Sequence, residues 1–171
     1  MKIRMNIDGV LFELNITDYR KSVNKDELDE WSKTDLLLKS RYLSYHIDND
    51  EILLVDEIEE IRDNLKLLLD GKMDEKTEMS FIEPDISLVL FPNKNIINPL
   101  FARLRGKDPF YVQLEMKVNI WDEVQTGNSF SMILDRQNIE NLKTYLELIT
   151  GEIDYNDKAV RKMIKSGILV E

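Results

Sequence analysis

The sequence predicts an α+β fold in which an antiparallel sheet of about six to seven strands carries two main helices and a short C-terminal helix on one face. Three observations lead to this class. Strand-like runs follow one another through short turns, strongly amphipathic helices interrupt them, and the regular strand–helix alternation of a parallel sheet is missing. The 171 residues suit one domain, residues 1–171, and a domain of this size buries roughly 70% of its unfolded surface.

The expected strands are apolar or alternating runs that lie between turn residues. Asp8-Gly9 separates the first two runs, and an Asp-Gly pair in this setting is a strong hairpin signal. Polar and apolar residues alternate across Phe110–Trp121, as in a strand with one buried face. Two long loops are expected, Thr17–Lys33, which carries Trp31, and Pro92–Pro109. The strands are expected at Lys2–Ile7, Val10–Ile16, Asp35–Ile47, Glu78–Ile82, Ile86–Phe91, Phe110–Trp121 and Ser129–Leu134.

The clearest helix is expected over Glu57–Asp70. Asp56 and Glu59 match a capping box, in which the N-cap side chain and the residue three positions later bind each other's backbone N–H groups. Isoleucine and leucine residues then recur every three or four positions, which places them on one helical face. Gly71 follows where a left-handed C-cap residue belongs, so the sequence indicates both ends of this helix.

Two further helices are expected toward the C-terminus. Asp135 can cap the second helix, whose apolar residues share one face, and Gly151 ends it. A short third helix begins after Asp157 and runs to Ser166-Gly167. The apolar stripes of these helices are expected to pack against the sheet.

Composition excludes several functional classes. The chain has 23 Lys and Arg residues against 33 Asp and Glu residues, a formal charge of −10, whereas binding to nucleic acid or anionic membranes requires clustered basic residues. It has no cysteine, so a disulfide framework and a zinc–thiolate site are ruled out. No run reaches the roughly 18 apolar residues of a membrane span, and the N-terminus lacks the apolar stretch of a signal peptide. We therefore expect a cytoplasmic protein that binds neither nucleic acid nor membranes.

The residues do not combine into a predicted catalytic or metal site. Nucleophilic and acid–base catalysis usually need His, Cys or an activated Ser, and the single histidine, His46, lies in an expected strand without a partner motif. Acidic residues between Asp48 and Glu59 have part of the spacing of a calcium loop. Ile52 and Leu53, however, stand where that loop needs an oxygen ligand and a glycine. We expect no enzymatic activity, no cofactor and no metal.

Acidic residues are concentrated between Asp48 and Asp63, where eight acids accompany one base, Arg62. Projected at about 100° per residue, the acids of the first helix lie opposite its apolar stripe. Acids around an aromatic or leucine side chain are typical of a surface that binds a basic protein. A solvent-exposed helix face, with the tryptophan packed in the core, gives the same pattern. The candidate partner-binding residues are Trp31, Asp56, Glu59, Glu60, Asp63 and Leu67.

Several short segments occur in an order that is similar to a known family. They are Asp29-Glu30-Trp31, the run from Glu51 to Glu59, Leu67–Gly71, Phe81–Ile86, Gln113–Val118 and Asn138–Leu142. Together they span about three quarters of the chain, Asp26–Thr150, and resemble the WapI-type immunity protein family. Members of that family are small bacterial cytoplasmic proteins paired with secreted polymorphic toxins. The resemblance implies a non-enzymatic inhibitor that occludes a basic toxin domain, often a nuclease, and it assigns no particular site residue.

A second interpretation is a homo-oligomeric interaction or scaffold domain. Basic residues gather on the last expected helix, at Lys158, Arg161, Lys162 and Lys165. They are consistent with ion pairing across a homodimer, with contact to an acidic partner, or with simple charge balance. The sequence leaves the oligomeric state open.

Overall fold

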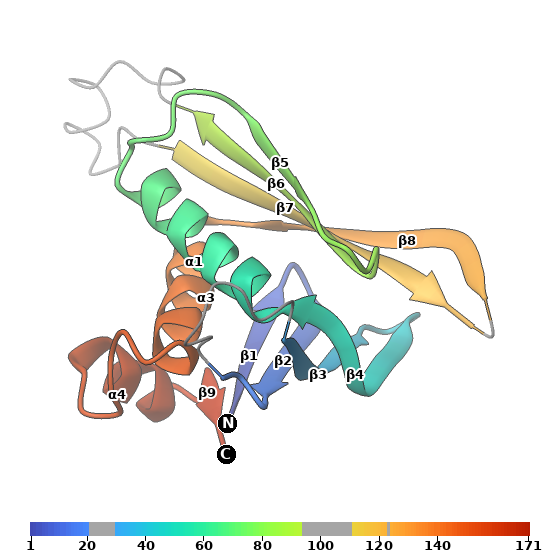
Figure 1. The fold of residues 1–171 in the computed structure, drawn as a ribbon, viewed down its shortest axis with the longest axis horizontal. Helices are drawn as coiled ribbons and strands as arrows, with labels where there is room; N and C mark the ends of the chain where they lie inside the picture. Colours follow the sequence, from blue (N-terminus) through green and yellow to red (C-terminus); the bar gives the residue numbers. More distant parts are fainter. Residues whose placement is uncertain (21–29, 94–110, 123) are drawn as a thin grey trace.

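The computed structural model describes residues 1–20, 30–93, 111–122 and 124–171. Within these residues, nine strands form two antiparallel sheets, and three helices pack with them (Figure 1). The first sheet has the strand order β4-β3-β2-β1-β9, and the second has the order β5-β6-β7-β8. The predicted α+β class is confirmed, whereas the prediction of one sheet with six to seven strands is wrong.

The first sheet begins with the predicted hairpin. Asp8 and Gly9 both have positive φ, 49° and 85°, as a two-residue type I′ turn requires, and Ile7 pairs with Val10. The sheet consists of β1 (Lys2–Ile7), β2 (Val10–Thr17), β3 (Trp31–Lys39), β4 (Ser44–Leu54) and β9 (Leu169–Val170). Because β9 pairs with β1, the two chain termini lie close together (Figure 1).

The strand predicted over Asp35–Ile47 is two strands, β3 and β4, joined by a hairpin. The Ser40 hydroxyl accepts the N–H groups of Tyr42 and Leu43 at 3.3 and 3.1 Å, and the Ser40 N–H donates to the Leu43 carbonyl at 2.8 Å. This turn contains no Gly, Pro, Asn or Asp, so it carries none of the strongest turn signals.

The loop predicted over Thr17–Lys33 is too long at both ends. Thr17 is the last residue of β2, and Trp31 is the first residue of β3, so Trp31 belongs to a strand and not to a loop. Residues 21–29 of the predicted loop lie outside the described part of the chain.

The second sheet follows the first helix. Its strands are β5 (Thr77–Ser80), β6 (Ile86–Asn93), β7 (Tyr111–Trp121) and β8 (Gln125–Leu134). The predicted alternation in β7 is confirmed from Val112 to Val118, where every second residue is buried. The loop predicted over Pro92–Pro109 begins too early, because Pro92 belongs to β6, and residues 94–110 are outside the described residues.

The helices are α1 (Val55–Leu69), α3 (Arg136–Ile149) and α4 (Lys158–Lys165). The N-cap prediction is right for α3, where the Asp135 side chain accepts the Asn138 N–H at 2.9 Å. It is wrong for α1, which begins two residues earlier than predicted. Leu54 is the N-cap of α1, and the Glu57 carboxylate accepts the Leu54 N–H at 2.9 Å, whereas Asp56 lies inside the first turn.

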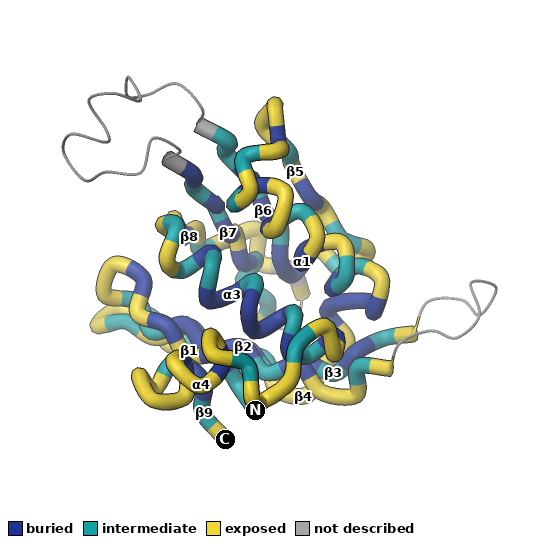
Figure 2. Tube along the Cα trace, turned by 90° about the vertical axis from the view of Figure 1, so that its left-hand side faces the viewer, coloured by how far each residue is buried: buried dark blue, intermediate teal, exposed yellow. Residues whose placement is uncertain are grey.

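One cluster of buried side chains connects both sheets and the helices. α1 contacts β4 and β6, and α3 contacts β1, β7 and β8, so each of these helices bridges the two sheets (Figure 1). The helices therefore cover one face of each sheet, and the dark, buried segments of Figure 2 meet between them. α1 connects the two sheets along the chain, because it follows β4, an edge strand of the first sheet, and precedes β5, an edge strand of the second.

No helix in the described ranges combines the length and the apolar character needed to cross a bilayer.

Candidate functional site

The predicted acids of α1 follow one exposed side of the helix. Asp56, Glu60 and Asp63 are exposed, and the Leu67 side chain is 43% exposed. Their spacing of three and four residues places them on one face. The buried residues of α1 lie on the other side: Val55, Ile58, Ile61, Arg62, Leu65 and Leu68.

Two of these carboxylates are bonded to groups of the protein itself. The Tyr19 hydroxyl donates to Glu59 at 2.5 Å, and burial together with this bond raises the pKa of Tyr19. Arg62, whose side chain is 10% exposed, donates to Asp63 at 2.8 Å and lies 3.5 Å from Glu152. The carboxylates of Asp56 and Glu60 have no such partner among the described residues. The face therefore keeps a negative charge, although its acids are not all free.

Trp31 lies at one end of this face. It pairs with Leu54 in the first sheet, and the Val55 N–H donates to the Glu30 carbonyl at 3.0 Å, so Trp31 is next to the start of α1. Leu67 is twelve residues beyond Val55, which corresponds to about 18 Å along the helix. The structure thus brings Trp31 to the Asp56 end of the predicted surface and separates it from Leu67.

Trp31 instead lines a hollow that the sequence did not predict. Two adjoining open hollows of about 410 and 400 Å³ share the side chains of Asp50, Glu83 and Asp85. Trp31 lines one of them, and Tyr45, Trp121 and Asp122 line the other. We name the two together the acidic hollow. Its aromatic walls are Trp31, Tyr45 and Trp121, and its carboxylates are Asp48, Asp50, Glu51, Glu83, Asp85 and Asp122.

Irregular pairing places Asp50 at the hollow. Leu36 pairs with Ile47 and Thr34 with Asp50, so β4 has one more residue than β3 between these two pairs. Asn49 has a φ of 52°, a left-handed conformation that asparagine tolerates better than most residues, and its N–H donates to Asp35 at 2.8 Å. A bulge of this kind changes the direction of the following side chains.

Three contacts hold the opposite wall, which is the connection between β5 and β6. The Ile82 N–H donates to the Glu57 carboxylate at 2.8 Å. Asn119 of β7 donates its backbone N–H to the Asp85 carbonyl at 2.8 Å, and its side-chain amide donates to the Pro84 carbonyl. This connection is therefore attached to α1 on one side and to the second sheet on the other.

A further contact joins the two sheets at the hollow. The backbone N–H of Trp121, the last residue of β7, donates to the Tyr45 hydroxyl of β4 at 3.3 Å. The acidic hollow therefore lies where the edge strand of the first sheet meets one end of the second.

The carboxylate of Asp85 is the most unusual group of the hollow. The residue is only 9% exposed, and burial, followed by the charges of Asp50 and Glu83, raises its pKa. Hydrogen bonds from its own backbone N–H and from the Trp121 indole N–H act to lower the pKa of Asp85, but they do not outweigh burial and the neighbouring charges. Burial and the charges of Asp85 and Asp50 also raise the pKa of Tyr45. The negative potential of the hollow thus contributes to raising the pKa values of both Asp85 and Tyr45.

Basic side chains pair with only two carboxylates of the hollow in the described part of the chain. Glu51 lies 2.8 Å from Lys33, and Asp48 lies 3.4 Å from His46. The other four, Asp50, Glu83, Asp85 and Asp122, make no ion pair with the described residues.

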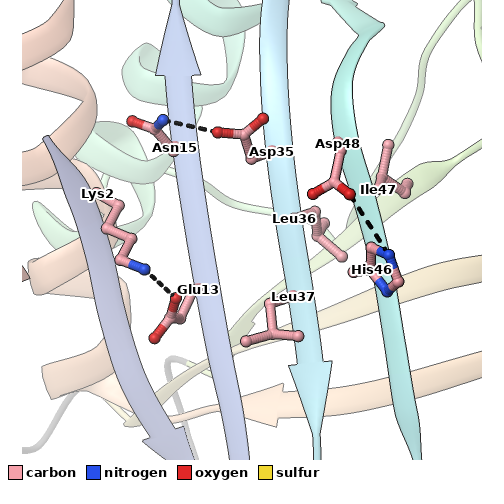
Figure 3. Close-up of a pocket in the computed structure, with 9 residues that line it drawn as sticks. All are labelled: Lys2, Glu13, Asn15, Asp35, Leu36, Leu37, His46, Ile47 and Asp48. Atoms are coloured by element: carbon pink, nitrogen blue, oxygen red, sulfur yellow. Dashed lines mark hydrogen bonds and ion pairs between the residues drawn. The ribbon is translucent and has the colours of Figure 1, made fainter.

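The outer face of the first sheet provides a contrast. Figure 3 shows a hollow there in which polar groups from neighbouring strands bind each other. Lys2 and Arg4 lie 2.5 and 2.6 Å from Glu13, and the Asn15 amide donates to Asp35 at 2.8 Å. Charges on this face are balanced within the sheet, so it offers little to a charged partner.

The arrangement of the acidic hollow favours binding of a cationic group. Ligand pockets of enzymes are mostly apolar with a few polar groups, and this hollow is open and lined by carboxylates. Among the residues that the structure describes, no three His, Asp or Glu side chains are arranged to hold a metal ion. Its acids lie in two short triplets, Asp48-Asn49-Asp50 and Glu83-Pro84-Asp85, and neither triplet alone signals that the fold brings them together.

Comparison with known proteins identifies a family. A family model described as the immunity protein WapI-like family matches residues 2–153, from β1 to four residues beyond α3. The match is wider than the resemblance over Asp26–Thr150, which it confirms. No curated protein matches the chain.

Proposed function

Because the chain belongs to the WapI-like immunity protein family, we propose that it is a cytoplasmic, non-enzymatic immunity protein that binds and occludes one cognate bacterial toxin domain. The match over residues 2–153 carries this proposal, since the family supports toxin inhibition in general. The proposed partner is a basic protein, and a nuclease domain fits because its substrate groove must attract phosphate.

The acidic face of α1 is the surface proposed to meet the toxin first. Asp56, Glu60 and Asp63 are exposed along it, and Glu59 lies beside them. Leu67 offers an apolar contact at one end, and Trp31 lies at the other. Exposed charges of this kind accelerate association with an oppositely charged protein, and salt weakens the effect.

Binding kinetics with the toxin domain encoded by the adjacent gene test the proposal. We expect nanomolar-range or tighter binding by the wild type, and a fall of about tenfold in on-rate with a weaker salt dependence for the Glu60→Lys, Asp63→Lys double variant. The matched control is Glu75→Lys, Glu171→Lys, because both residues are exposed and lie outside α1.

The outcomes separate the surface from the function. Unchanged on-rates and salt dependence in the double variant would remove the α1 face from the proposal. Absence of wild-type binding to the adjacent toxin domain would reject the proposed function. Thermal unfolding of each variant verifies that loss of the Arg62–Asp63 ion pair has not unfolded the protein.

The basic side of α4 favours a second candidate, a homo-oligomeric interaction domain. Lys158, Arg161, Lys162 and Lys165 are exposed there, while α1 and the hollow are acidic, so two copies could pair through opposite charges. Light scattering at low and high salt tests it, and a monomer at both would exclude it.

A further inference from the structure

The acidic hollow brings Asp50, Glu83 and Asp85 together without a basic side chain paired to any of them among the described residues. A buried carboxylate without a cation is unfavourable, and such groups are normally paired or replaced by neutral ones. Asp85 is nine-tenths buried, and Asp50 and Glu83, from two other positions in the chain, bring like charge to it. No Lys or Arg of the described residues is paired with these three groups, although Lys33 pairs with Glu51 at the same hollow.

We propose that the acidic hollow binds an arginine side chain of the partner protein, with Asp85 and Asp50 as its anions and Trp31 and Trp121 as its walls. The inference rests on the proposed function for the identity of the partner, a toxin domain. It names what the partner must present: a guanidinium group on a projecting surface.

Two features of the hollow favour arginine over lysine. A guanidinium is planar, donates several N–H groups in a fixed fork to carboxylates, and stacks on aromatic rings. The hollow offers carboxylates from two sides, Asp50 on β4 and Asp85 directly before β6, and each of its two parts has one indole ring, that of Trp31 or of Trp121. An ammonium group would use the charge but neither the planar walls nor the paired acceptors.

Binding of the cation would also remove the cost that Asp85 imposes on the free protein. A desolvated arginine between carboxylates and aromatic rings is a typical centre of a protein interface, where a few residues carry most of the affinity. The hollow is therefore placed as the anchor of the complex.

The two tryptophans of the chain provide a direct test, because both line the hollow. We would titrate the protein with N-acetyl-L-argininamide and follow the two indole N–H signals by NMR. The neutral analogue N-acetyl-L-citrullinamide is the matched control, and N-acetyl-L-lysinamide measures the contribution of charge alone. We expect saturable shifts of both indole signals with the arginine compound, a weaker effect with the lysine compound, and none with the citrulline compound.

Variants assign the response to the carboxylates. Asp85→Asn and Asp50→Asn are each expected to weaken arginine binding by about fivefold or more. Glu171→Gln removes the same charge beyond β9, the opposite edge of the first sheet from β4, about 19 Å away at about 4.8 Å per strand. It should bind as the wild type does.

The results decide between the inference and the function on which it rests. Equal responses to the arginine and citrulline compounds, or no response of either indole, would overturn the inference. Toxin binding that is strong and unaffected by Asp85→Asn would overturn it too while leaving the proposed function intact. Arginine binding in the hollow without any binding of the toxin domain would reject the proposed function alone.

Discussion

Replacing Glu57 by alanine should destabilise the protein, because this carboxylate joins two elements. One of its oxygens accepts the Leu54 N–H at the start of α1 at 2.9 Å, and the other accepts the Ile82 N–H after β5 at 2.8 Å. A hydrogen bond to a charged group contributes about 1.5–3 kcal/mol to the free energy of unfolding. We assign the lower value to the bond with Ile82, because this bond is exposed to solvent. An acid in the first turn of a helix adds about 0.3–1 kcal/mol.

The expected loss for Glu57→Ala is therefore about 3–5 kcal/mol of unfolding free energy. For a chain of this length that corresponds to a fall in Tm of roughly 6–20 °C. Urea and thermal unfolding measure both quantities. Glu57→Gln keeps one acceptor oxygen, so its loss should be smaller than that of the alanine variant.

The matched control is Glu60→Ala, on the same helix and one turn away. Its carboxylate is exposed, so the unfolding free energy should change by no more than about 0.5 kcal/mol. If Glu57→Ala were no more destabilising than Glu60→Ala, the bridge between α1 and the β5–β6 connection would not stabilise the fold. The explanation given for the position of Asp85 would then fail too.

Three further variants test the electrostatics and the core. The folded-state pKa of Asp85 is raised above its unfolded value of about 3.9. The contribution of this carboxyl to stability therefore becomes less favourable as pH rises from the unfolded pKa to the folded pKa, by at most about 1.4 kcal/mol per pH unit. Asp85→Asn should therefore be more stable than wild type at pH 7 in urea unfolding, and lower stability would contradict this. Burial acts to raise the pKa of Glu13, but the hydrogen bonds from Lys2 and Arg4 outweigh burial, so the pKa is lowered. Its contribution is present above about pH 4.3 and lost as pH falls through the folded pKa, so Glu13→Gln should flatten the acid side of a stability–pH profile. The buried Tyr145 hydroxyl accepts the Ile16 N–H at 2.8 Å, so Tyr145→Phe should cost about 1–3 kcal/mol in urea unfolding; a loss under about 0.5 kcal/mol would contradict the assignment.

Features with a local physical cause could be predicted from the sequence. The Asp8-Gly9 turn, the Asp135 cap of α3 and the alternation in β7 each depend on a few adjacent residues. The first helix was found from its apolar spacing, yet its cap was assigned wrongly. The acidic run offers several residues that satisfy the same capping pattern. In the structure Glu57 accepts the N–H groups of Leu54 and Ile82, whereas Glu59 accepts the Tyr19 hydroxyl, and the sequence signals neither of the tertiary contacts.

Features that depend on pairing between distant segments could not be predicted. The β3–β4 turn at Ser40 has no Gly or Asn, so two strands were interpreted as one. The acidic hollow forms because the left-handed Asn49 changes the direction of β4 and because Asn119 holds Asp85 in place. Asp85 lies 35 residues along the chain from Asp50. Periodicity carries no information on either event, so the sequence pointed to the helix acids and missed those of the hollow.

The two acidic surfaces should affect different steps of toxin binding. Exposed charges act at a distance and mainly change the on-rate, whereas a desolvated charge at the centre of an interface acts after contact and mainly changes the off-rate. Glu60 and Asp63 are exposed, while Asp85 is nine-tenths buried. We therefore expect Glu60→Lys with Asp63→Lys to slow association with little effect on dissociation, and Asp85→Asn to accelerate dissociation about tenfold or more at an unchanged on-rate. Surface plasmon resonance at two salt concentrations separates the rates. If Asp85→Asn changed only the on-rate, Asp85 would act as one more surface charge, and the hollow would not be an anchor.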